Sequence, residues 1–263
     1  MPIPELTLPN AALLFGAAVL AGALNAVAGG GSFIAFPALL FVGLPPVPAN
    51  ATNTVALWTG LLFSGGAFRR HINVPRPVLG TLASASVVGG IVGAILLLRT
   101  PAHTFMRVLP WLMLAATLLF IFGGKLIRPR QDQTIHQRTT PTLLVAAGFQ
   151  FLVAIYGGYF GGGMGIVILA MLTAFGMADI HHMNALKIVL STATNGIAVL
   201  IFIASHAVYW HEAVIMIAGA ALGGFFGAHY SLRLSQKLVR RFVIVVGSSM
   251  TAYFFARSYW LMR

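Results

Sequence analysis

The chain has 263 residues, of which 59% are hydrophobic and only 8% are charged, a composition that excludes an ordinary soluble domain and indicates a polytopic membrane protein. Its formal net charge of +12 does not indicate nucleic-acid binding, because the basic residues fall in short loops and form no patch with interleaved aromatic residues. The absence of cysteine excludes disulfides, cysteine-ligated metals and thiol chemistry.

Ten apolar segments follow one another along the chain, and we expect them to be the helices of an all-α membrane protein. They cover residues 10–28, 31–44, 50–68, 78–98 and 108–124, then 143–160, 162–177, 185–204, 213–231 and 242–258. A full crossing needs about 20 residues. Segments 31–44 and 162–177 are shorter, so we expect half-helices of broken or re-entrant hairpins there.

The first two segments are separated by three consecutive glycines, Gly29, Gly30 and Gly31, which are followed by Ser32. Glycine is a poor helix former, and a broken helix in lipid leaves backbone groups without partners. We therefore expect this break to be buried in protein or to line a wet cavity. Asn25, four residues before the glycines, is a weaker candidate for the same site.

The second half of the chain repeats the first. The three glycines return as Gly161, Gly162 and Gly163, Asn50 corresponds to Asn184, and Asn53 corresponds to Lys187. This divides the chain into a first transmembrane repeat, residues 1–124, a basic linker, 125–142, and a second repeat, 143–263. Because each unit has an odd number of net crossings, we expect two inverted-topology repeats.

The two kinds of glycine pattern predict different roles. The pairs Gly89/Gly93 and Gly223/Gly227 have the spacing that lets helices pack closely. The triple glycines instead disrupt the backbone, and in inverted-repeat transporters such breaks meet near the membrane midplane. Their freed N–H groups and the positive N-terminal ends of the following helices can bind an anion there. We therefore expect the two triple-glycine breaks to be two halves of one substrate site.

Polar residues continue the candidate site along the third and eighth segments. They are Asn50, Asn53 and Thr54 in the third, and Asn184, Lys187, Ser191 and Asn195 in the eighth. Their spacing of three and four residues places them on one face of each helix. They could bind a solute, or they could tie helices together. Lys187 is a functional candidate because ionisable groups are costly in membranes, and the alternative is that it snorkels to the interface.

The acidic residues are few. Glu5, Asp132, Asp179 and Glu212 are the only ones, and we expect all four to lie in the N-terminal tail or in loops. The site should then be neutral to positive and suited to an anion. His181 and His182 beside Asp179 do not predict a metal site. No cofactor is expected, and the absence of enzyme motifs indicates a protein that is not an enzyme.

Basic residues in the loops predict the orientation. One face has most of them: Arg69, Arg70, Arg76, Lys125, Arg128, Arg130, Arg138, Arg233, Lys237, Arg240 and Arg241. The other face has Arg99, Arg107, Arg257 and Arg263. By the positive-inside rule the first face is cytoplasmic and both termini lie outside.

The sequence also resembles a known family. The stretch "NAVAGGGSFIAFPALL" followed by "PANATNTVALWTG", repeated as "YGGYFGGGMGIVILAML" followed by "HHMNALKIVLSTATNG", is similar to the sulfite exporter TauE/SafE family. The resemblance covers the entire chain. It implies a bacterial inner-membrane or archaeal permease for small sulfur-containing anions such as sulfite, organosulfonates or thiosulfate.

Residue by residue, the resemblance places the family's glycine-rich breaks on Gly29 to Gly31 and Gly161 to Gly163, and its lysine on Lys187. The first half has Asn53 where the second has this lysine, so one cation with neutral donors is expected, which suits a monoanion or a singly anchored sulfonate. Export by alternating access is the expected function. Import coupled to a cation, an anion channel and a homodimer through the glycine faces are left open.

Overall fold

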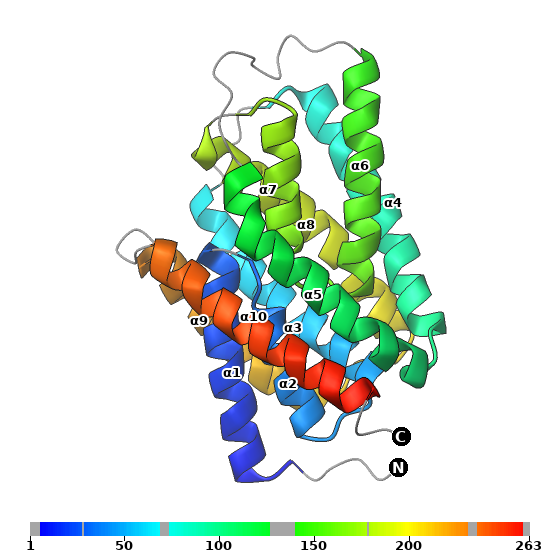
Figure 1. Ribbon diagram of the computed structural model, residues 1–263, viewed down its shortest axis with the longest axis vertical. Helices are drawn as coiled ribbons and strands as arrows, with labels where there is room; N and C mark the ends of the chain where they lie inside the picture. The colour runs from blue at the N-terminus through cyan, green and yellow to red at the C-terminus, as the bar shows by residue number, and fades with distance from the viewer. Residues whose placement is uncertain are drawn as a thin grey trace.

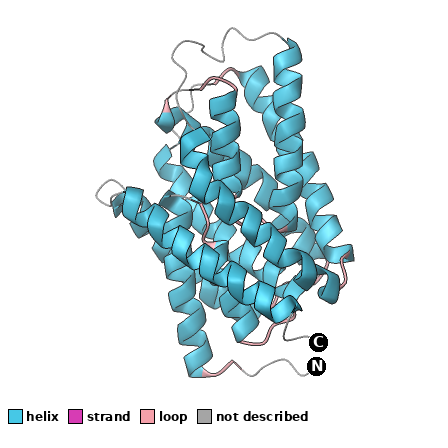
Figure 2. Cartoon of the chain, in the orientation of Figure 1, coloured by secondary structure: helices cyan, strands magenta, loops and turns pink. Residues whose placement is uncertain are grey.

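The computed structural model describes residues 6–27, 29–68, 74–126, 140–177, 179–230 and 236–259, and within these the regular secondary structure is entirely helical (Figure 2). The expected all-α fold is confirmed. The ten helices are α1 (Leu8–Val27), α2 (Ser32–Phe41), α3 (Pro46–Phe68), α4 (Arg76–Arg99), α5 (Ala102–Leu126), α6 (Thr140–Tyr159), α7 (Met164–Ala174), α8 (Ile180–Ala204), α9 (Trp210–Tyr230) and α10 (Gln236–Tyr259).

Several helices begin earlier than the apolar segments that predict them. The helix α3 begins at Pro46, α5 at Ala102 and α8 at Ile180, whereas the apolar segments begin at residues 50, 108 and 185. Hydropathy marks only the part of a helix that lies in hydrocarbon, and a polar first turn can be helical outside it. Six of the described helices, α1, α4, α5, α6, α8 and α9, are long and apolar enough to cross a membrane.

The helices α2 and α7 are short, as expected. They have 10 and 11 residues, or about 15 and 17 Å at 1.5 Å per residue, about half the 30 Å hydrocarbon core of a bilayer. In Figure 1, α2 returns toward the end of the molecule from which α1 enters, and α7 returns toward the opposite end, from which α6 enters. Each short helix packs against the long helix before it. The two pairs are therefore helical hairpins, and whether they re-enter the membrane stays a prediction.

The two halves interlock. The helix α1 packs along α9, and its counterpart α6 packs along α4; α3 packs on α9 and α8, and α8 packs on α4 and α3. This pattern is unchanged when each helix is exchanged for its counterpart in the other half. The halves are thus not separately packed bodies, and the expected linker at 125–142 lies largely outside the described residues. The inverted orientation of the two repeats in a membrane stays a prediction.

Glycines allow the closest helix pairs to form. A Cβ atom on Gly89 of α4 would lie 2.5 Å from the carbonyl oxygen of Phe151 in α6. A Cβ atom on Gly227 of α9 would lie 2.6 Å from Cα of Ala23 in α1. Backbone cannot yield at such distances, so any larger residue would separate the helices. The expected packing role of these glycines is confirmed.

Aromatic side chains fix the first hairpin against the rest of the molecule. The ring of Phe36 in α2 lies 6.1 Å from that of Phe105, 6.0 Å from that of Phe160 and 6.3 Å from that of Phe254, measured between centroids. These rings come from α5, the second break and α10. Offset and edge-to-face pairs of this kind each add about 0.5–1.5 kcal/mol beyond their burial. They hold the first break close to the second.

Candidate functional site

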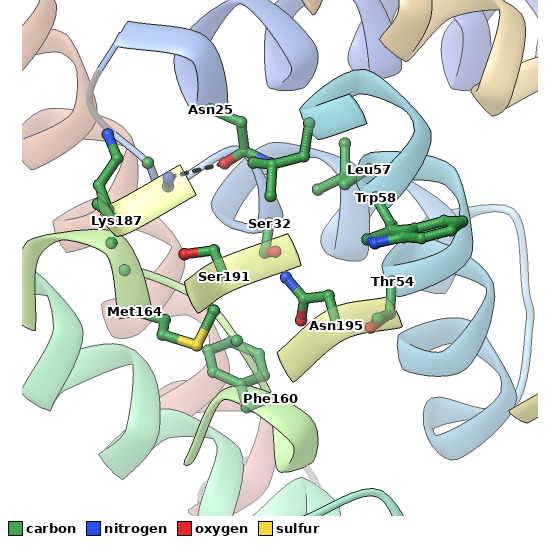
Figure 3. Close-up of a pocket in the computed structure, with 16 residues that line it drawn as sticks. Asn25, Ser32, Thr54, Leu57, Trp58, Phe160, Met164, Lys187, Ser191 and Asn195 are labelled. Carbon is green, nitrogen blue, oxygen red and sulfur yellow. Dashed lines mark hydrogen bonds between the residues drawn. The ribbon is translucent and has the colours of Figure 1, made fainter. Parts of the chain in front are cut away.

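A cavity of about 50 Å³ lies where the two glycine breaks meet (Figure 3). The breaks are in near contact, because a Cβ atom on Gly29 would lie 3.6 Å from Cα of Gly165. Four parts of the chain line the cavity: the first break, α3, the second break and α8. The lining residues are Asn25, Gly29, Gly30, Ser32, Thr54, Leu57, Trp58, Leu61, Phe160, Gly161, Gly163, Met164, Gly165, Lys187, Ser191 and Asn195.

Asn25 holds the first break. Its Oδ1 accepts hydrogen bonds from the N–H groups of Gly30, at 3.0 Å, and Gly31, at 2.8 Å. Gly29 and Gly30 have φ values of 70° and 147°, which only glycine adopts readily. The two N–H groups that Asn25 binds are therefore engaged and do not face an anion as free donors. The expectation that the backbone donors of this break hold the substrate is wrong for these two groups, because a side chain already satisfies them.

The second break is held differently. The hydroxyl of Tyr156 donates a hydrogen bond to the carbonyl oxygen of Gly162, so the side chain here engages an acceptor. Gly161 and Gly163 have φ values of 75° and 77°. Among the described residues, none of the backbone hydrogen bonds uses the N–H groups of Gly162 and Gly163 as donors. The two breaks thus correspond in sequence but differ in which backbone groups they leave available.

Lys187 brings the positive charge. It extends from α8, is 4% exposed, and its Cδ would lie 3.2 Å from a Cβ atom on Gly165, so this glycine makes room for the lysine side chain. Figure 3 shows the amine directed toward the first break. Among the described residues, no carboxylate lies within 4.0 Å of the Lys187 amine. Burial disfavours the snorkelling alternative, and a buried charge without a partner is costly.

Two helix N-termini meet the same cavity. The helix α2 begins at Ser32 and α7 begins at Met164, and both residues line the cavity. The positive end of each helix dipole therefore faces the lining. Together with Lys187, the two helix ends make the cavity electropositive and suited to a small anion.

The helices α8 and α3 form facing walls. Ser191 and Asn195 lie on the α8 side. On the α3 side, the Thr54 hydroxyl donates to the carbonyl oxygen of Asn50 at 2.9 Å, and the Trp58 Nε1 donates to the carbonyl oxygen of Thr192 at 3.2 Å. The second of these bonds joins α3 to α8 across the interface between the halves.

Five of the residues predicted for the site do not line the cavity: Gly31, Asn50, Asn53, Gly162 and Asn184. Asn50 donates through Nδ2 to the carbonyl oxygen of Tyr159, at 2.9 Å, and so fixes the end of α6. Asn53 donates through Nδ2 to Ser32 Oγ at 3.2 Å and fixes the start of α2. These two asparagines follow the alternative in which polar residues tie helices together.

Sequence reasoning missed the apolar part of the lining. Leu57, Trp58 and Leu61 of α3 line the cavity, as do Phe160 and Met164 near the second break. The sequence does contain a signal for the α3 residues. They follow Thr54 at spacings of three, four and seven residues, which place them on the same helical face as Thr54. Polarity alone marks Thr54 and not the apolar residues that follow it on the same face of α3.

The predicted location of one acidic residue, Glu212, is wrong. Glu212 lies in the first turn of α9, within the candidate span Trp210–Gly227, and it is 2% exposed. Its Oε2 has no hydrogen-bond partner in the described part of the chain. The expectation that every carboxylate lies in the tail or in loops is wrong, because α9 begins before the unbroken apolar run that marked it. The described residues hold no group of three His, Asp or Glu side chains that could bind a metal.

Comparison with known proteins agrees with this architecture. The family described as Sulfite exporter TauE/SafE matches residues 14–254, which include all four parts of the cavity lining. The chain belongs to the TauE/SafE family. No solved structure matches it significantly.

The relatives within the TauE/SafE family are membrane transporters by name. A probable membrane transporter protein of Haemophilus influenzae is 31% identical over 242 residues, which cover 92% of each chain. The probable membrane transporter protein ORF9 of a Sinorhizobium species is 32% identical, over 89% of this chain and 88% of its own. The probable membrane transporter protein YfcA of Escherichia coli is 30% identical, over 91% and 87%. The protein is thus a multi-pass membrane protein of a transporter family.

Proposed function

We propose that the cavity is the substrate site of a transporter for small sulfur-containing anions such as sulfite, organosulfonates or thiosulfate. The observation that carries the proposal is Lys187, which is 4% exposed and lies beside the N-terminal ends of α2 and α7 with no carboxylate within 4.0 Å among the described residues. An anion that binds there would neutralise the buried charge. The volume of about 50 Å³ has room for roughly three to five water-sized groups, which suits an ion of a few heavy atoms.

Alternating access is the mechanism that we propose. The cavity lies between the first-half helix α3 and the second-half helix α8, so that each half supplies one wall. If one half rocks against the other, the cavity opens to one side and then to the other, as in inverted-repeat transporters. The bond from Trp58 to Thr192 crosses this interface and would have to break or reform during the cycle.

Export is the direction that we propose, from a cytoplasm bounded by the inner membrane with the basic loops inside and both termini outside. With an inside-negative potential, one negative charge that leaves the cell gains about 2.3 kcal/mol per 100 mV, which supports a gradient of about fifty-fold. No coupled ion is needed for this. Glu212 favours a second candidate, import coupled to a cation, because a buried carboxylate with an unpartnered oxygen is a group that can bind a proton or a metal cation.

The test is flux of labelled sulfite into liposomes that contain the purified protein, with the membrane potential set by potassium and valinomycin. We expect saturable flux that the potential drives without any other ion gradient. Lys187→Gln should abolish it, and Arg107→Gln, which removes an exposed positive charge from α5, should leave it unchanged. Absence of Lys187-dependent flux for every sulfur-containing anion at any imposed potential or ion gradient would refute the proposal.

The same vesicles separate the alternatives. A carrier exchanges labelled for unlabelled substrate faster than it performs net flux, whereas a channel shows neither exchange stimulation nor saturation at modest concentration. Cation-coupled import predicts uptake that needs a proton or sodium gradient and that Glu212→Gln uncouples from it. If the membrane potential drives the same flux in Glu212→Gln as in the native protein, export remains the supported direction.

A further inference from the structure

The two facing walls of the cavity correspond in sequence but not in chemistry. At the spacing that pairs Asn50 with Asn184, Leu57 corresponds to Ser191 and Leu61 corresponds to Asn195. All four of these residues from α3 and α8 line the cavity. At these two positions the helical face is therefore polar in the second half of the chain and apolar in the first, whereas Thr54, one turn earlier on α3, adds a hydroxyl to the lining where the second half has Ile188.

Trp58 completes the apolar wall. Its Nε1 donates to the carbonyl oxygen of Thr192, its own counterpart, at 3.2 Å. A Cβ atom on Gly196 would lie 3.3 Å from this ring, so the missing side chain of Gly196 lets the indole lie against α8. The single hydrogen-bond donor of the indole is thus used, and what Trp58 adds to the lining is apolar ring surface.

Two polar groups lie on the other side of the cavity, whereas Thr54 lies beside Trp58 on the α3 side (Figure 3). Figure 3 shows Lys187 and Ser191 on the side away from Leu57 and Trp58. Leu57 is 5% exposed and Leu61 is 9% exposed, so a ligand that touches them is shielded from water. An oxygen or amino group pressed against Leu57 and Leu61 would lose its hydration without gaining a partner from these two side chains. A methyl group in the same place would gain from its burial.

We propose that the site selects small organic monoanions over inorganic oxyanions of the same charge. The anionic head is held by Lys187 and the polar wall of α8, and a substituent of one or two carbon atoms packs on the wall formed by Leu57, Trp58 and Leu61. Those three residues then determine specificity. This inference rests on the proposed function, since it names which anions the same site prefers.

The test compares methanesulfonate with sulfamate. Both are monoanions with the same sulfonate head and almost the same size, and they differ in carrying a methyl or an amino group. Binding to the purified full-length protein is measured by isothermal titration calorimetry. We expect methanesulfonate to bind at least fourfold more tightly, and ethanesulfonate to gain about another fourfold, the value of one buried CH₂ group. Butanesulfonate should lose this gain because it exceeds the cavity.

Exchange variants test the assigned wall. In Leu57→Ser and Leu61→Asn, each leucine receives the residue of its counterpart in the second half. The preference for methanesulfonate over sulfamate should fall toward one in both variants, with sulfamate still bound. Leu62→Ser is the matched control, because Leu62 is the next residue on α3 and is 45% exposed. It should keep the full preference.

The outcomes distinguish this inference from the proposed function. Equal affinities for methanesulfonate and sulfamate in the native protein would overturn the inference. A preference for methanesulfonate that survives both exchange variants would overturn it as well. In either case, Lys187-dependent sulfite flux would leave the proposed function in place. Absence of Lys187-dependent binding or flux for every anion would overturn both. An exchange variant that fails to fold is recognised by loss of sulfamate binding, and the comparison of the two ligands on the native protein then decides alone.

Discussion

Replacement of Asn25 by leucine should destabilise the first break more than any other single polar substitution around the cavity. Asn25 Oδ1 accepts from both Gly30 and Gly31, at 3.0 and 2.8 Å. Leucine has nearly the same size and no acceptor. The substitution therefore leaves two backbone N–H groups without a partner, and Gly30 and Gly31 are themselves buried.

The magnitude follows from the number of orphaned groups. A buried donor that loses its acceptor costs about 1–3 kcal/mol, so two of them cost about 2–6 kcal/mol. For a chain of this size each kcal/mol shifts the melting temperature by about 2–4 °C, so a fall of about 5–20 °C is expected. Asn25→Asp keeps an acceptor oxygen in place and should restore most of the loss.

The assay is thermal unfolding of the purified protein in detergent, followed by loss of monodisperse protein and by intrinsic fluorescence. Native protein, Asn25→Leu and Asn25→Asp are measured side by side. A melting temperature for Asn25→Leu within 2 °C of the native value would refute the reasoning, because the two N–H groups would then have found other acceptors. Equal losses in both variants would mean that the amide NH₂ group, and not the acceptor, stabilises the break.

Three further predictions concern the backbone. Gly163→Ala should lower the free energy of unfolding by about 1–2 kcal/mol, because φ is 77° at this position and a Cβ atom is strained there. Gly148→Ala is the control, since nothing lies within 4 Å of the added atom, and it should be neutral or slightly stabilising in the same melting assay. Tyr156→Phe removes the donor to the Gly162 carbonyl and should cost about 1–3 kcal/mol, and an unchanged melting temperature would contradict that bond. Gly227→Leu should abolish recovery of monodisperse protein, since its Cβ would lie 2.6 Å from a backbone atom of α1.

The sequence was sufficient for the number and type of the helices because the bilayer imposes a strong rule. A segment in hydrocarbon must satisfy its backbone internally, so each long apolar run is a helix. The same rule indicated that the triple glycines are buried among other helices, and the near contact of Gly29 with Gly165 agrees with it. Helix starts such as Pro46 of α3 were less well predicted, since the rule does not apply outside the hydrocarbon.

The site was predicted only in part, because residue type does not tell which way a polar group is used. Asn25 and Asn50 are both amides near a glycine break, yet Asn25 lines the cavity and Asn50 caps the end of α6. Their partners are set by tertiary packing that hydropathy and spacing do not encode. The apolar lining was missed for the opposite reason, since Leu57 and Trp58 look like ordinary core residues until the cavity beside them is known.

The two halves have diverged in a consistent direction. In the first break Asn25 occupies two N–H groups, whereas in the second break Tyr156 occupies a carbonyl group, and no backbone acceptor among the described residues binds the N–H groups of Gly162 and Gly163. Lys187 and Ser191 belong to the second half as well, and the apolar wall at Leu57 belongs to the first. If the halves rock during transport, the charged head of a bound anion therefore moves with the second half. The contact that must then slide is the wall of α3, which is apolar at Leu57 and is joined to α8 by the hydrogen bond from Trp58 to the carbonyl oxygen of Thr192, so this bond must break or reform as the halves move.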